Sequence, residues 1–239
     1  MLFDPLPRAV LIDVGFTLTF CDGDRIAASA ALAGVTADPA ALHRVESLLR
    51  AELKESIGTA IKPHDPAGKA WGETFFRRML ELAATQGDPD VLDRAAEIVW
   101  REHLVRNVWC RVGDGVKEAV TRLRAGGFRL AVVSNSEGTV EAMLEEVGLR
   151  SSFETVVDSW NVGVAKPDPA IFEIALRRLG LGPDEAVMVG DSPRMDVAGA
   201  RAAGIRPALL DPFDLYPAVD APHFRDLRHF ADEILGGGR

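Results

Sequence analysis

The sequence contains few cysteines, few histidines and no long apolar stretch. Its two cysteines, Cys21 and Cys110, are expected to be free thiols in a reducing cytoplasm, although a disulfide between them remains open. The histidines form no ligand pattern with one another, so we interpret them as structural or solvated residues. They are His43, His64, His103, His223 and His229.

A membrane segment and a basic surface are also missing. No apolar run approaches the roughly 20 residues that a membrane span requires, and the opening stretch MLFDPLPR lacks the apolar region of a signal peptide. The formal net charge is −9, whereas nucleic acids and anionic membranes bind basic surfaces. We therefore expect a cytoplasmic protein with neither nucleic acid nor membrane as its partner, and the oligomeric state stays open.

The rest of the composition is that of a globular protein. The chain has 239 residues, of which 47% are hydrophobic and 26% charged, enough for one large domain or two modest ones. Between residues 22 and 107, an aspartate that precedes a proline begins a helix three times, at Asp38, Asp65 and Asp88. Apolar residues then recur at helical spacing. This segment predicts a helical bundle, which either packs against the rest or covers a site.

The remaining sequence alternates strands with helices. The expected strands are Ala9–Ile12, Arg129–Val133, Glu154–Val157, Ala186–Val189 and Pro207–Leu210. Apolar strands that alternate with helices predict an α/β fold, with a Rossmann-like, doubly wound parallel sheet and right-handed crossovers. The bundle is then an α-helical cap, residues 21–107, inserted into a core formed by residues 1–20 and 108–239.

Polar residues follow four of these strands. Because ligands bind at the carboxyl ends of the strands in an open parallel sheet, we expect these side chains to converge at one edge. They are Asp13, Ser134 with Asn135, Lys166, Asp191 with Ser192, and Asp196.

This set of side chains suits phosphoryl transfer. Carboxylates without histidine favour a hard cation such as Mg²⁺, which neutralises phosphoryl charge. An aspartate such as Asp13 can attack phosphorus to form an aspartyl-phosphate, and a hydroxyl such as that of Ser134 can hold the other oxygens. A lysine such as Lys166 stabilises the developing charge. Each residue alone has a plainer interpretation, as a turn, a helix cap or a solvated loop, but all four in order favour a catalytic site.

Four motifs carry a family resemblance: DVGFT, VVSNS, AKPDP and VGDSPRMD. In this order and spacing they resemble the haloacid dehalogenase superfamily, and the resemblance covers essentially the whole chain. It implies a mobile cap that closes over the site. By position it implies Asp13 as the nucleophile, Lys166 as the stabilising cation and Thr17 as the residue that positions the nucleophile loop. It implies that Ser134, with Asn135 beside it, binds the phosphoryl group. The implied metal ligands are Asp13, Gly15 and Asp191, and Asp196 is either a further ligand or a neighbour of the ligands.

Gly15 is the departure from the family pattern. Most phosphatases of this superfamily carry an aspartate here, which acts as general acid and base and whose backbone carbonyl also ligates the metal. A glycine keeps the carbonyl but loses the acid, which is typically worth about 10²–10⁴-fold in rate. A substrate with a good leaving group needs this proton less. Asp22 or Asp24, close in sequence, is a candidate replacement acid.

Three functions remain open at this point. We favour a Mg²⁺-dependent phosphatase that acts on a small phosphorylated metabolite and prefers good leaving groups. The alternatives are a 2-haloacid dehalogenase, whose relatives also lack the second acid, and a degenerate protein that only binds. Two other groups of cap residues are ambiguous. Arg77 and Arg78 either lie on a solvated face or reach a substrate anion, and Trp71, Trp100 and Trp109 either pack the cap or line the substrate side.

Overall fold

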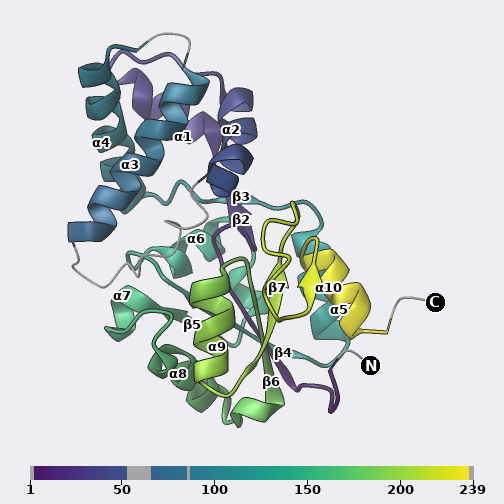
Figure 1. Ribbon diagram of the computed structural model, residues 1–239. Helices are drawn as coiled ribbons and strands as arrows, with labels where there is room; N and C mark the ends of the chain where they lie inside the picture. The colour runs from purple at the N-terminus through teal and green to yellow at the C-terminus, as the bar shows by residue number, and fades with distance from the viewer. Residues whose placement is uncertain (1–2, 53–65, 85–86, 237–239) are drawn as a thin grey trace.

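The core of the protein is a six-stranded sheet in which every neighbouring pair is parallel (Figure 1). The computed structural model describes residues 3–52, 66–84 and 87–236. The strand order is β5-β4-β1-β6-β7-β8. The strands are β1 (Ala9–Ile12), β4 (Arg129–Ser134), β5 (Thr155–Asp158), β6 (Ala186–Gly190), β7 (Arg206–Leu210) and β8 (His223–Phe224). The predicted α/β class with a parallel sheet is confirmed.

Helices cover both faces of the sheet, because its central strands are apolar on both sides. In β1, Val10 and Ile12 pack against one helical layer, whereas Ala9 and Leu11 pack against the other. The first layer contains α5 (Val116–Ala125), α6 (Val140–Glu146) and α10 (Leu227–Ile234). The second contains α8 (Pro169–Leu179) and α9 (Gly199–Ala202). Shorter helices are η1 (Arg150–Ser152), α7 (Ser159–Val162), η2 (Pro183–Glu185) and η3 (Pro193–Ala198).

Four helices form a separate bundle beside the carboxyl ends of the strands (Figure 1). They are α1 (Gly23–Ala31), α2 (Pro39–Glu52), α3 (Pro66–Ala83) and α4 (Pro89–Val105). The bundle has its own apolar cluster, centred on the fully buried Phe75, Phe76 and Met79. Two of the expected caps lie at helix starts: Asp88 accepts from the amide of Asp90, and Asp38 from those of Ala40 and Ala41. Asp65 lies outside the described residues.

A short antiparallel ribbon joins the bundle to the sheet. It pairs β2 (Thr19–Phe20) with β3 (Arg111–Val112), and both crossings of the chain pass through it. Cys21 and Cys110 directly flank this ribbon, and both are free and buried. Burial raises the pKa of Cys110 to about 12, so this side chain is a thiol at neutral pH.

The elements that the sequence patterns missed include the β2–β3 ribbon, β8 and α1. The β2–β3 ribbon and β8 are two-residue strands, too short to show an alternating pattern. Helix α1 was missed because it begins at Gly23 rather than at a proline, although Asp22 caps it. Within the described parts of the chain, no helix is long and apolar enough to cross a membrane.

Candidate active site

The candidate site lies at the carboxyl ends of three neighbouring strands. Asp13 directly follows β1, Ser134 ends β4, and Asp191 directly follows β6. Because β4, β1 and β6 are adjacent in the sheet, residues more than 170 positions apart meet at one edge. All three side chains are buried.

Lys166 is the cation at the centre of this edge. Its Nζ donates to Oδ1 of Asp13 at 2.5 Å and to Oδ1 of Asp196 at 2.7 Å. Only 2% of Lys166 is exposed, so water contributes little to the solvation of its charge. Removing either carboxylate would leave the buried charge of Lys166 poorly compensated, so losing either contact would destabilise the folded protein.

Burial and charge act against each other in this cluster. Burial raises the pKa of Asp13 to about 7, and the neighbouring carboxylates of Asp196 and Asp191 act in the same direction, while Lys166 opposes them. Burial lowers the pKa of Lys166, but the charges and hydrogen bonds of Asp13 and Asp196 have a larger effect and raise this pKa above its usual value. Lys166 therefore remains an ammonium, and a further positive charge beside Asp13 would favour its ionised form.

Three carboxylates at this edge could hold a metal ion. Asp13, Asp191 and Asp196 each offer an oxygen, and these oxygens all lie within 4.8 Å of one another. Buried carboxylate oxygens are the donors that a hard divalent cation such as Mg²⁺ takes. Gly190 makes the approach possible, because a Cβ there would lie 2.3 Å from Cγ of Asp196. The residues present therefore fit Mg²⁺.

Asp196 also organises the loop that carries Asp191. Its Oδ2 accepts from the backbone N–H of Ser192 at 2.9 Å, while its Oδ1 faces Lys166. Ser192 in turn caps η3 by accepting from the amide of Met195. Both oxygens of Asp196 are thus already engaged by protein groups.

Asn135 holds the backbone of Lys166 instead of projecting freely. Its Oδ1 accepts from the amide of Lys166 at 2.8 Å, and its Nδ2 donates to the carbonyl of the same residue at 3.0 Å. This reciprocal pair ties the loop after β4 to the loop before α8. Asn135 was predicted to bind substrate beside Ser134, and its observed contacts fix the position of the cation.

Asp158 and Ser159 were missed in the sequence, although Asp158 ends a buried strand just as Asp13 follows one. The Asp158 carboxylate accepts from the amides of Gly138, Val140 and Trp160. Ser159 Oγ accepts from the amide of Ser136 and donates to its carbonyl. Burial raises the pKa of Asp158, and the backbone hydrogen bonds partly offset it. Together these residues fix the loop that follows Ser134.

Thr17 and Gly15 lie in the turn after Asp13. The amide of Thr17 donates to the carbonyl of Val14, while its buried hydroxyl has no hydrogen-bond partner among the described residues. The hydrogen bond that Thr17 makes to this turn therefore comes from its backbone. Gly15 is open: a Cβ there would meet nothing within 4 Å.

A cavity of about 120 Å³ lies over this turn, between the sheet edge and the bundle. We call it the cap–core cavity. Loop residues 14–16 and 134–137 line it from the core, and His103, Asn107 and Trp109 line it from the far side. Trp109 also packs against Phe75 and Phe76, so it both fills the bundle and lines the cavity.

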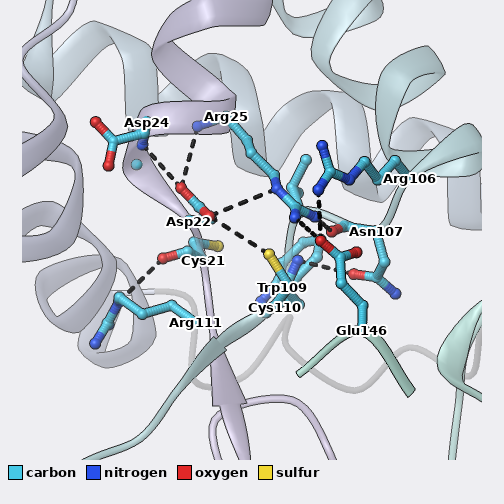
Figure 2. A network of polar contacts seen from close by, with 12 residues as sticks. Cys21, Asp22, Asp24, Arg25, Arg106, Asn107, Trp109, Cys110, Arg111 and Glu146 are labelled. Carbon is cyan, nitrogen blue, oxygen red and sulfur yellow. Dashed lines mark hydrogen bonds and ion pairs between the residues drawn. The ribbon is translucent and has the colours of Figure 1, made fainter. Parts of the chain in front are cut away.

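Asp22 and Asp24 were the candidate replacement acids. Figure 2 shows Asp22 at the start of α1, where its Oδ1 accepts from the amides of Asp24 and Arg25 and its Oδ2 from the thiol of Cys110. Asp24 is exposed to solvent. Neither residue lines the cap–core cavity, and the contacts of Asp22 are those of a helix cap.

The same view shows how the bundle contacts the core. Glu146, in α6, accepts hydrogen bonds from Arg25 and from Arg106, the latter at 2.5 Å (Figure 2). Arg25 also donates to the carbonyl of Asn107. These ion pairs hold the two parts together on one side of the ribbon.

The remaining ambiguous residues have structural contacts. Arg77 pairs with Glu81 and Asp93, and Arg78 pairs with Glu81. Trp100 is buried in the bundle, while the side chain of Trp71 lies outside the described residues. His43, His223 and His229 each contact the nearby backbone. His103 is buried, and His64 lies outside the described residues.

Three buried carboxylates and a buried lysine at the edge of a doubly wound sheet define a class of hydrolase. A family model described as haloacid dehalogenase-like hydrolase matches residues 7–204. The chain belongs to this family, which confirms the resemblance seen in its four motifs.

Named relatives include phosphatases and dehalogenases. A phosphoserine phosphatase of Thermus thermophilus is 32% identical over 219 residues, covering 87% of this chain and 82% of its own. The solved structure of a phosphatase from Thermococcus onnurineus is 25% identical, covers 97% of this chain and 99% of its own, and has a TM-score of 0.61. A 2-haloacid dehalogenase from Pseudomonas syringae is 26% identical, covers 98% and 100%, and has a TM-score of 0.57.

Proposed function

We propose that this hydrolase is a Mg²⁺-dependent phosphatase that acts on a small phosphorylated metabolite through an aspartyl-phosphate on Asp13. The observation that carries the proposal is the third carboxylate: Asp191 stands beside Asp13 and Asp196 within ligand distance. Displacing a halide requires no metal site, whereas transferring a dianionic phosphoryl group to a carboxylate does require charge neutralisation.

Each residue of the site has a separate role in the proposed reaction. The Asp13 carboxylate attacks phosphorus as the bond to the leaving-group oxygen breaks, and water then hydrolyses the acyl phosphate to regenerate Asp13. Lys166 neutralises charge on the transferred group, and the Ser134 hydroxyl holds one of its oxygens. Asp13, Asp191 and the Gly15 carbonyl would hold Mg²⁺, which supplies neutralisation of phosphoryl charge. Asp196 positions Lys166 and the Ser192 loop, because both of its oxygens already accept hydrogen bonds.

Gly15 gives the phosphatase a bias toward good leaving groups. No carboxylate projects from this position, so the departing oxygen leaves without a positioned acid. The leaving groups of acyl phosphates and anomeric sugar phosphates depart readily without an acid, whereas those of simple alkyl phosphates do not. The bundle is proposed to act as a cap over the site, with the β2–β3 ribbon as its connection to the core, and we expect the protein to be cytoplasmic.

The test is phosphate release from a graded panel: acetyl phosphate, p-nitrophenyl phosphate, a sugar 1-phosphate and an alkyl phosphate. Wild type and Asp13→Asn are compared in Mg²⁺ and in chelator. We expect release that requires both Asp13 and Mg²⁺ and that falls steeply as the leaving group worsens. Equal rates across the panel would show that another group donates the proton.

Dehalogenation is the second candidate, favoured by Gly15 and by the similarity to the Pseudomonas syringae enzyme. It predicts chloride release from 2-chloropropionate that depends on Asp13 and persists in chelator. A protein with neither activity would instead fit a role in binding only.

A further inference from the structure

The cap–core cavity contains a polar pair of side chains from the bundle and the core that the proposed chemistry does not use. Nε2 of His103, from α4, lies 3.1 Å from Oε2 of Glu137, in the loop that follows Ser134. His103 is 2% exposed, and the Glu137 side chain is 10% exposed. Both residues line the cavity together with Gly15 and Ser134.

The backbone determines which atom of this pair carries the proton. Nδ1 of His103 accepts from the amide of Val108 at 3.3 Å, so it is unprotonated. Nε2 therefore carries the hydrogen and donates it to Glu137. His103 thus orients one oxygen of the carboxylate and leaves the negative charge on Glu137. The other oxygen, Oε1, accepts no hydrogen bond from the described residues.

The position of the cavity assigns it to the leaving group. In phosphoryl transfer the attacking and departing oxygens are roughly in line, so the leaving group points away from Asp13. The cavity covers the turn just after Asp13 and borders Ser134, the expected phosphoryl-binding residue. Its volume of about 120 Å³ lies well below the roughly 300–1,000 Å³ of sites for drug-sized ligands. A leaving group of a few heavy atoms would fill this volume.

We propose that, among small phosphate esters with comparable leaving-group reactivity, Glu137, oriented by His103, favours those whose leaving group carries a hydroxyl or ammonium donor and disfavours those that carry a carboxylate. The inference rests on the proposed phosphatase function and names its substrate class. A donor two carbons from the ester oxygen would meet the free oxygen of Glu137, whereas a carboxylate would meet a like charge in a poorly solvated site. Among the described residues that line the cavity there is no arginine or lysine to offset that repulsion.

The proposal is tested with four small esters: 2-aminoethyl, 2-hydroxyethyl, propyl and carboxymethyl phosphate. In wild type we expect kcat/KM for the first two to exceed that for propyl phosphate by about tenfold or more, the usual value of a hydrogen bond to a charged group. Carboxymethyl phosphate should rank last. In Glu137→Gln, the aminoethyl advantage should fall about tenfold and the penalty on carboxymethyl phosphate should shrink.

A matched variant separates recognition from a structural role. Glu146→Gln removes the charge of another carboxylate that joins the bundle to the core, but Glu146 does not line the cavity. It should change all four esters by the same factor. The same pattern in Glu137→Gln, or a wild type that prefers carboxymethyl phosphate, would overturn the proposal.

A binding measurement distinguishes this inference from the proposed function. Calorimetry in Mg²⁺ buffer compares 3-aminopropylphosphonate, butylphosphonate and 3-phosphonopropionate, in which a CH₂ group replaces the ester oxygen so that they cannot be hydrolysed. An affinity order of amino over butyl over carboxyl, lost in Glu137→Gln, supports the leaving-group site even if no ester turns over. Turnover of the esters without any such order retains the phosphatase and rejects the role of Glu137.

Discussion

A Cβ atom at Gly190 would lie 2.3 Å from Cγ of Asp196. The last residue of β6 is therefore a glycine because a buried carboxylate occupies the space of its side chain. That carboxylate in turn faces Lys166 and the amide of Ser192. The cluster of carboxylates at this edge of the sheet therefore depends on the close approach of Asp196 to Gly190 as well as on the acidic residues themselves.

Gly190→Ala is expected to displace Asp196 and the loop that carries Asp191. We expect a loss of about 1–3 kcal/mol in the free energy of unfolding, typical of overpacking a close contact, together with weaker Mg²⁺ affinity. Urea unfolding and a Mg²⁺ titration measure the two effects. Gly15→Ala is the control for stability, since its Cβ meets nothing within 4 Å. Equal stability of the two variants would contradict the steric argument.

Lys166→Met would leave Asp13 and Asp196 buried without their cation. At pH 7.5 in chelator, we expect the free energy of unfolding to fall by about 3–5 kcal/mol, the usual cost of removing one partner of a buried ion pair. The loss should be smaller at pH 5, because Asp13, whose pKa is raised by burial, then takes up a proton in the folded state. Urea unfolding at the two pH values tests this. Lys117→Met, at an exposed position, should cost less than about 0.5 kcal/mol.

The raised pKa of Asp13 gives the metal-free protein a pH dependence. Burial raises it to about 7 from its ordinary value of 3.8. Between these values the folded state binds a proton that the unfolded chain releases, so this group lowers stability as pH rises from about 4 to 7. Asp13→Asn should lack this contribution. Thermal unfolding in chelator across this range should therefore show the variant gaining stability relative to wild type as pH rises, and parallel curves would reject the assignment.

Gly15→Asp should supply the acid that the turn lacks. The position has space for a side chain, and its φ lies outside the left-handed region. We expect the rate with a simple alkyl phosphate to rise, up to the roughly 10²–10⁴-fold that a positioned acid provides, while the rate with acetyl phosphate changes little. Gly15→Asn matches the size without the acid. A similar gain in both variants would show that the effect is not proton transfer.

The sequence was sufficient for the framework of the protein. Apolar strands alternating with helices, and helices capped by aspartate–proline pairs, are local patterns, and they predicted the parallel sheet and the bundle. The two-residue strands were missed because they are too short to show an alternating apolar pattern. Helix α1 was missed because no proline marks its start. The candidate residues Asp13, Ser134, Lys166 and Asp191 were visible because polar groups after buried strands are costly without a role.

Only the tertiary structure decided what those residues contact. The sequence could not show that Asn135 holds the backbone of Lys166, or that both carboxylate oxygens of Asp196 accept hydrogen bonds from protein groups. It also could not pair His103 with Glu137, since these residues are 34 positions apart on different elements. The first two contacts depend on how the loops of the core meet at the sheet edge, and the third depends on how the bundle packs against the core. Both are long-range packing results that no local pattern encodes. The sequence determined which chemical groups reach the sheet edge, and the packing of the bundle decided which of them line the cap–core cavity.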